Sequence, residues 1–187
     1  MRSFFLCLIA CLLLISFPAC SPSAQRNPFA YAEGGFSVSV RGTYSPAGET
    51  APRPFAAQIT VGVPVGGDLT LRDLTVTFTA PPTLAGVTVS AVHANGTRTV
   101  TFSYASDYGN VELPTKSEAF DGFLRFAEAL LPLGDVVDIS PVTDGSYTVT
   151  RKGEGREAVF TFAEGQVFPL RVAVTSSEEV LTFTVTP

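Results

Sequence analysis

The sequence predicts an α+β fold, in which a mostly antiparallel β-sheet is covered by a single helix. Three observations support this prediction. Apolar and polar residues alternate with a period of two along seven segments. Clusters of Gly, Pro, Asn and Asp, which favour turns, separate these segments. Only residues 115–134 place their apolar side chains at spacings of three and four, as on one face of a helix.

The first residues are typical of a targeting segment. Arg2 precedes an apolar run of about 14 residues, which is shorter than the roughly 20 residues that span a bilayer. Residues 17–20, "FPAC", then resemble a bacterial lipobox, in which the cysteine becomes acylated and N-terminal. We therefore expect residues 1–19 to be a lipoprotein signal peptide and Cys20 to be the lipid attachment site. The alternative is an ordinary signal peptide that is cleaved near Ala24.

Composition argues against several classes of function. The chain has 12 basic and 17 acidic residues, and loss of Arg2 with the signal leaves 11 against 17, a net charge of about −6. The longest basic run is the pair Arg151-Lys152, so binding of nucleic acid through its phosphates is not expected. Anionic lipid would not attract such a chain either. We expect acyl chains on Cys20 to hold the protein at the cell membrane, on the extracytoplasmic side.

After Cys20 the chain divides into a short tether, residues 20–28, and a single β-rich domain, residues 29–187. The alternating segments place one apolar row on each predicted strand, and threonine fills much of the opposite row because it is β-branched yet polar. Asn95-Gly96 lies between two such segments and predicts a hairpin. The apolar rows are 36–40, 55–63, 74–78, 100–104, 158–162, 170–174 and 181–185.

The helical segment is expected at about 116–131, before the helix-breaking Pro132 and Gly134. Each large apolar residue of its stripe contributes roughly 1.5–3 kcal/mol when buried. That exceeds the cost of about 1 kcal/mol for a glycine inside the helix, so we expect the helix to lie on the sheet.

Three segments together resemble a known fold: the early strands 36–63, the Thr-rich strand 73–80 that leads into "PPTLAG", and "FTFAEGQVFPLRVAV" at 160–174. In this respect the chain is similar to the lipoprotein carrier fold, the LolA, LolB and LppX-like group. The resemblance implies an antiparallel β half-barrel of about eleven strands around an apolar concavity. It also implies binding or transfer of a hydrophobic ligand. Unlike those carriers, this chain shows one convincing helix and none before the first strand.

Signatures of catalysis are scarce. His93 is the only histidine and stands at a strand end, without an acid or nucleophile beside it in sequence. There is no G-x-S-x-G, no phosphate-binding glycine loop and no second cysteine after Cys20. The sequence therefore predicts neither an enzyme nor a metal site nor a cofactor.

Two main hypotheses for function remain, and a domain accessory to an enzyme is a weaker third. The first is a lipid-anchored protein that binds or transfers a lipid or acyl chain. The second is a non-catalytic cell-envelope interaction module with a filled β core. Phenylalanine is abundant, at 15 of 187 residues, but a cavity lining and a packed core use the same side chains. For the first hypothesis the expected ligand-binding residues lie on the helix stripe: Phe120, Phe123, Leu124 and Leu130.

Overall fold

The structure is a computed structural model that describes residues 27–94, 96–106, 109–115, 121–153 and 155–187. The expected signal peptide, Cys20 and nearly all of the expected tether lie outside these residues, as does Phe120. Within the described part, the chain forms eleven strands, one α-helix and one short 3₁₀ helix.

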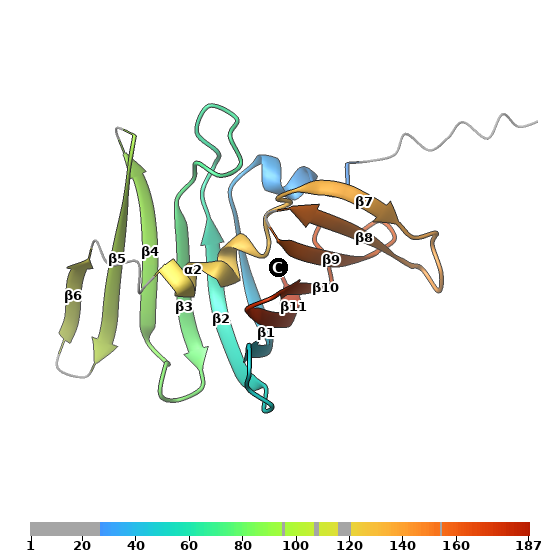
Figure 1. The fold of residues 1–187 in the computed structure, drawn as a ribbon. Helices are drawn as coiled ribbons and strands as arrows, with labels where there is room; N and C mark the ends of the chain where they lie inside the picture. Colours follow the sequence, from blue (N-terminus) through green and yellow to red (C-terminus); the bar gives the residue numbers. More distant parts are fainter. Residues whose placement is uncertain (1–26, 95, 107–108, 116–120, 154) are drawn as a thin grey trace, which may run out of the picture.

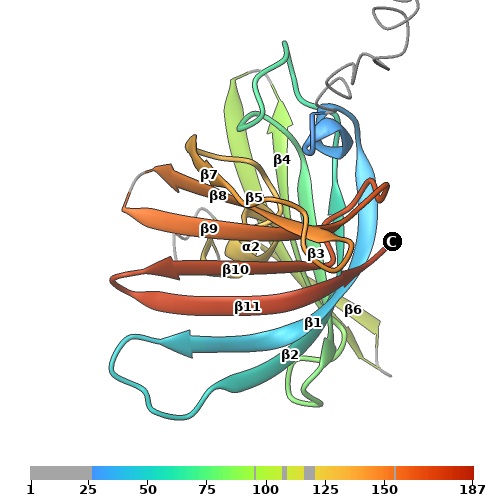
Figure 2. The same cartoon turned by 90° about the vertical axis from the view of Figure 1, so that its right-hand side faces the viewer.

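The strands form one antiparallel sheet in the order β6-β5-β4-β3-β2-β1-β11-β10-β9-β8-β7 (Figures 1 and 2). Within the described residues the end strands β6 and β7 do not pair, so the sheet stays open. The predicted half-barrel of about eleven strands is thereby confirmed. The strands are β1 (Phe36–Pro46), β2 (Arg53–Val61), β3 (Leu74–Ala80), β4 (Val87–Ala94), β5 (Thr97–Ser106), β6 (Gly109–Thr115), β7 (Asp135–Ile139), β8 (Ser146–Gly153), β9 (Arg156–Ala163), β10 (Arg171–Ser176) and β11 (Glu179–Thr186).

The predicted alternation sets the two faces of the sheet. On β3, Leu74, Val76 and Phe78 are buried while the threonines between them are partly exposed. Those threonines form hydroxyl contacts with β4, at 3.1 Å from Thr75 to Ser90 and 3.0 Å from Thr77 to Thr88. Cross-strand pairs of this kind stabilise a sheet by a few tenths of a kcal/mol to about 1 kcal/mol each. The β4–β5 hairpin pairs Ala94 with Thr97, as the Asn-Gly dipeptide between them predicts.

The sheet bends where β1 meets β11, so that β7–β11 turn away from β2–β6 to form a second wall (Figures 1 and 2). Gly42 lies at this crossing, opposite Phe183. A Cβ atom on Gly42 would overlap the carbonyl oxygen of Thr182 and would lie 2.5 Å from the Cα of Phe183. Only glycine lets the two backbones approach this closely, so the bend depends on it.

The helix α2 (Asp121–Glu128) lies on the concave side of the sheet, against β2, β3 and β4 (Figure 1). It ends three residues earlier than the predicted boundary at 131, and residues 116–120 lie outside the described part. The chain then continues in turns, with Ala129 and Leu130 donating to the carbonyls of Arg125 and Ala127. The apolar stripe nevertheless continues, because Leu130 is buried as completely as the helical Leu124 and Leu131 is only 4% exposed.

A short 3₁₀ helix, η1 (Ala30–Glu33), precedes β1 and was not expected from the sequence. Asn27 starts it, because its Oδ1 accepts the backbone N–H of Phe29 at 3.0 Å. Tyr31 fixes it to the segment after α2 by donating its hydroxyl to the carbonyl oxygen of Leu130 at 2.6 Å. The element therefore closes one end of the half-barrel.

Candidate functional site

The interior has two different ends, which we call the filled end and the groove end. At the filled end, under η1, aromatic rings interlock. Phe29 meets Phe160 at 4.9 Å and Phe162 at 5.7 Å between ring centroids, both edge to face. Phe160 and Phe162 have no exposed surface, and Phe29 is 5% exposed. This part of the interior is a packed core, with no room for a ligand between these rings.

At the groove end, a half-open hollow of about 450 Å³ lies between α2 and the sheet. This volume falls within the range of about 300–1,000 Å³ that is typical of ligand pockets. Its walls come from the end of β1, the start of β2, the end of β3, the β3–β4 loop and α2. The lining residues are Tyr44, Arg53, Pro54, Phe55, Phe78, Pro81, Thr83, Leu84, Gly122, Phe123, Arg125 and Phe126.

Four phenylalanines form the apolar wall of this groove. Phe126 lies at the centre, 4.5 Å from Phe55 and 5.4 Å from Phe78 between ring centroids. Phe123 packs edge to face on Phe78 at 5.6 Å and keeps part of its surface free. All four rings line the hollow, but Phe55, Phe78 and Phe126 are only 1–6% exposed, so Phe123 alone offers a partly free face. The contacting rings therefore give the groove one continuous apolar wall.

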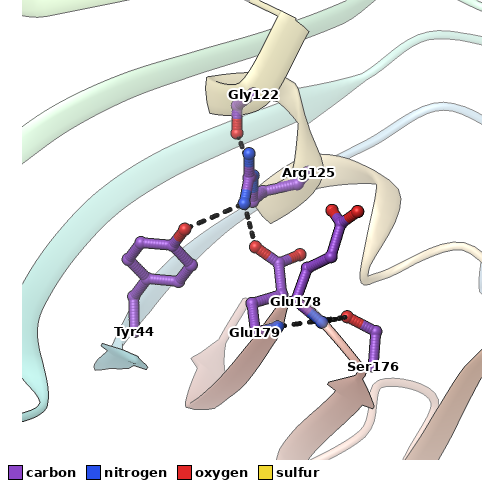
Figure 3. A network of polar contacts seen from close by, with 6 residues as sticks. All are labelled: Tyr44, Gly122, Arg125, Ser176, Glu178 and Glu179. Atoms are coloured by element: carbon purple, nitrogen blue, oxygen red, sulfur yellow. Dashed lines mark hydrogen bonds and ion pairs between the residues drawn. The ribbon is translucent and has the colours of Figure 1, made fainter. Parts of the chain in front are cut away.

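Arg125 supplies the polar group of the groove (Figure 3). Its Nη1 donates to the hydroxyl of Tyr44 at 2.9 Å and to Oε2 of Glu179, and its Nε donates to the carbonyl oxygen of Gly122. Glu179 is only 8% exposed, so the pair is partly withdrawn from water. Because the carboxylate neutralises the guanidinium, the groove presents N–H donors without a large net charge.

A second arginine stands at the mouth of the groove. Arg53, at the start of β2, donates its Nε to Oε2 of Glu49 at 2.8 Å, and both side chains are exposed. Exposed pairs of this kind contribute little to stability, about 0–1 kcal/mol. We therefore assign Arg53 to the surface around the groove rather than to its interior.

The sequence predicts four residues for ligand binding, and the structure places the three that it describes in different surroundings. Phe123 lines the groove, whereas Leu124 and Leu130 have no exposed surface and belong to the core. Phe120 lies outside the described residues. Sequence reasoning missed the other aromatic wall residues and the polar network, although alternation on β2 and β3 already placed Phe55 and Phe78 on the inner face.

Another buried cation lies near the filled end. Arg72 has no exposed surface, and one of its nitrogens donates to the carbonyl oxygen of Ala32 at 2.9 Å. Its Nε and Nη1 have no hydrogen-bond partner among the described residues. Burial lowers the pKa of Arg72 and raises the pKa of the neighbouring Tyr31 phenol. Arg72 thus contacts η1 through a single hydrogen bond, and the remaining nitrogens of its guanidinium gain no partner from burial.

The contacts of His93 join β4 to the residues that precede β3, which is a structural role. Its Nδ1 lies 2.8 Å from the backbone carbonyl oxygen of Arg72, and its backbone N–H donates to Oδ1 of Asp73 at 2.8 Å. Within the described ranges, no group of three or more His, Cys, Asp or Glu side chains is placed to hold a metal ion.

No helix in the described part of the chain combines the length and the apolar character needed to cross a membrane.

Comparisons with known proteins identify similar structures but no family. No family profile and no curated protein matches the sequence. A DUF1329 family protein from Desulfovibrio piger is 10% identical, covering 82% of this chain and 84% of that one, with a TM-score of 0.44. An uncharacterized conserved protein from Thermus thermophilus is 12% identical, covering 85% and 83%, with a TM-score of 0.43.

A third similar structure is a candidate outer membrane lipoprotein-sorting protein domain from Vibrio parahaemolyticus. It is 11% identical, covering 82% of this chain and 84% of that one, with a TM-score of 0.40.

Proposed function

We propose that this protein is a lipid-anchored extracytoplasmic protein that binds or transfers a hydrophobic ligand, a lipid or an acyl chain. The observation that carries the proposal is the half-open groove of about 450 Å³ with four phenylalanines in its wall. Apolar walls with a few convergent polar groups are the usual composition of a small-molecule site. The proposal extends the predicted ligand site from the helix stripe to the strands that face it.

The groove suits an amphipathic guest. Each methylene that moves from water onto the phenylalanine wall contributes about 0.8 kcal/mol. On the inner side of the groove, Arg125 and Tyr44 offer hydrogen bonds to a carbonyl or a headgroup of the ligand. Since Glu179 already neutralises Arg125, binding requires no ionised ligand. Binding and release need no covalent step, so we propose a carrier rather than an enzyme.

We propose that acylation of Cys20 anchors the protein. Support comes from the sequence, where an apolar run of signal-peptide length ends at "FPAC". The test is Cys20→Ala, which should leave an uncleaved precursor and abolish labelling by a radioactive or clickable fatty acid. Normal processing and unchanged membrane retention of this variant would refute the anchor without affecting the groove.

A second function, a non-catalytic interaction module with a filled core, has its own supporting observation. Phe160, Phe162 and Leu130 have no exposed surface, and the rings at the filled end interlock. If the groove binds no ligand, the packed core makes the domain a rigid scaffold, and its loops would contact other envelope proteins.

A crosslinking experiment distinguishes the two functions. The intact anchored protein in lipid nanodiscs is exposed to a fatty acid that carries a photoreactive diazirine, and crosslinked peptides are mapped by mass spectrometry. We expect crosslinks on the β2, β3 and α2 peptides that hold Phe55, Phe78 and Phe123. Thr83→Trp, an exposed position on the groove wall, should reduce them by filling the hollow.

The matched control is Thr99→Trp, which introduces the same side chain at an exposed position on β5 outside the groove. It should leave the crosslinks unchanged. Crosslinks that are absent from the wild-type protein, or that respond equally to both variants, would contradict a ligand-binding groove and favour the interaction module.

A further inference from the structure

Exposed apolar side chains gather at one rim of the half-barrel. This rim, which we call the tether rim, consists of η1 and the loops 62–73, 140–145 and 164–170. Six of its valines and leucines are between 43% and 66% exposed. In the described residues of the opposite-rim loops 46–53, 80–87 and 176–179, no large apolar side chain is exposed to this degree. The six are Val63, Val65, Leu71, Val142, Val167 and Leu170.

These loops form one continuous surface around η1. The backbone N–H of Glu164 donates to the carbonyl oxygen of Gly145 at 2.8 Å, which joins two of the loops. Phe168 packs on Tyr31 of η1 at 5.2 Å between ring centroids. On the other side, a Cβ atom on Gly35 would lie 3.5 Å from Cγ2 of Val63. An apolar patch shared by adjacent loops marks an interaction surface more reliably than scattered apolar residues do.

The described chain begins in this rim. Asn27 lines a hollow of about 350 Å³ together with Tyr147 and Val167. Cys20 precedes Asn27 by seven residues, so even a fully extended connection reaches about 25 Å. The opposite rim lies one strand length away, about 35 Å for the 11 residues of β1. An acyl anchor at Cys20 therefore holds the tether rim next to the membrane.

We propose that the tether rim is a membrane-docking surface, and that its valines and leucines enter the interface of the lipid layer that anchors Cys20. This inference rests on the proposed lipid anchor. The rim also indicates which lipid surface it fits. The exposed ionisable side chains of the tether rim are all acidic: Glu33, Asp68, Asp73, Asp144 and Glu164. The one basic residue in the same loops, Arg72, is buried. Docking onto zwitterionic lipid therefore avoids the repulsion that anionic lipid would impose.

Docking in this orientation sets the direction of the groove. The mouth of the groove is formed by Arg53, Pro54 and the 80–87 loop, all at the rim opposite to the tether. A docked molecule therefore turns the groove away from its own membrane. Its hydrophobic ligand would then be exchanged with a partner or a lipid surface across the aqueous space.

The test measures which rim is immersed in lipid. When Cys20 is acylated, the mature chain has no free thiol, so a single new cysteine can carry an environment-sensitive fluorophore. Val167→Cys labels the tether rim and Ser177→Cys labels the opposite rim, both at exposed loop positions and the latter outside the groove. In zwitterionic nanodiscs that hold one anchored protein each, we expect blue-shifted emission and quenching by nitroxide-labelled lipid at position 167, and neither at 177. The shift should shrink in anionic nanodiscs.

A second variant tests whether the apolar side chains cause the docking. Val63→Asp with Val65→Asp should return the fluorophore at position 167 to water while the protein stays anchored. Water-like emission at both labels in a co-purifying, anchored protein would overturn docking but leave the anchor intact. Failure to co-purify with the discs would instead refute the anchor. A further outcome is that the fluorophore at position 167 is shielded from water only in larger discs that hold several copies. That result would show that a second copy of the protein, not lipid, covers the tether rim, and it would also overturn docking.

Discussion

At the η1 end of the interior the aromatic rings close on one another, whereas at the α2 end similar rings line a groove. Phe160 and Phe162 have no exposed surface and contact Phe29, while Phe123 has a neighbour on one side and open space on the other. The side chains are the same, so the difference comes from the elements that carry them. A short 3₁₀ helix plugs the first end, and in the described residues the eight-residue helix α2 covers the second end only in part.

The largest expected effect is a difference in the free energy of unfolding between a variant of the filled end and a variant of the groove end. Phe160→Ala should lower the free energy of unfolding by about 3–5 kcal/mol, because it opens a cavity in a packed core. Phe123→Ala should cost less than about 2 kcal/mol, because its ring is only partly buried. Urea denaturation followed by circular dichroism gives both values. Equal losses for the two variants would mean that the groove wall is as tightly packed as the core.

The next effect concerns the polar network of the groove. Arg125→Met should lower the free energy of unfolding by about 1–3 kcal/mol, because it leaves the carboxylate of Glu179 without its cation in a site that is 8% exposed. The expected loss is smaller than the roughly 3–5 kcal/mol for a fully buried pair, because the Arg125 side chain is 30% exposed.

The control for this prediction is the double variant Arg125→Met with Glu179→Gln. Removing both charges should recover part of the loss, since no unpaired carboxylate remains. A double variant that is less stable than Arg125→Met alone would show that Glu179 contributes independently of Arg125.

Periodicity made the sheet and the helix predictable, and it could not reveal the groove. Burial on one face imposes the alternation of Leu74, Val76 and Phe78, so each strand can be recognised locally. The stripe that includes Leu124 and Leu130 likewise follows from burial, although the helical backbone ends before Leu130. The stripe persists because packing requires apolar side chains there whatever the backbone conformation.

The groove depends on pairings that have no local signal. Arg125 meets a carboxylate 54 residues later in the chain and a tyrosine 81 residues earlier. Such contacts depend on strand register and on the bend at Gly42. For η1 a local signal existed: Asn27 can accept a hydrogen bond from the residue two positions on, and it does so with Phe29.

A smaller effect, dependent on pH, is expected at the filled end. Burial raises the pKa of Tyr31, so the folded protein keeps a proton that the unfolded chain releases above about pH 10. Stability is therefore complete below about pH 10 and falls as the pH rises further. Tyr31→Phe should cost about 1 kcal/mol at neutral pH, through loss of the hydrogen bond to Leu130, and should reduce this alkaline loss.

Urea midpoints of the wild-type protein and Tyr31→Phe at about pH 8 and about pH 11 test this prediction. Some alkaline loss should persist in the variant, because burial also raises the pKa of Tyr147. Parallel changes in the midpoints of the two proteins would show that Tyr31 does not contribute to the alkaline transition.

The smallest expected effect concerns Arg72, whose Nε and Nη1 lack partners among the described residues. Arg72→Met keeps most of the buried volume, removes the cost of burying a charge and gives up one hydrogen bond to Ala32. These terms nearly cancel, so its free energy of unfolding should lie within about 1 kcal/mol of the wild-type value. Arg72→Ala, which also leaves a void, should be less stable than Arg72→Met. A loss well beyond this range for Arg72→Met would show that the guanidinium itself fastens η1 and keeps the filled end closed.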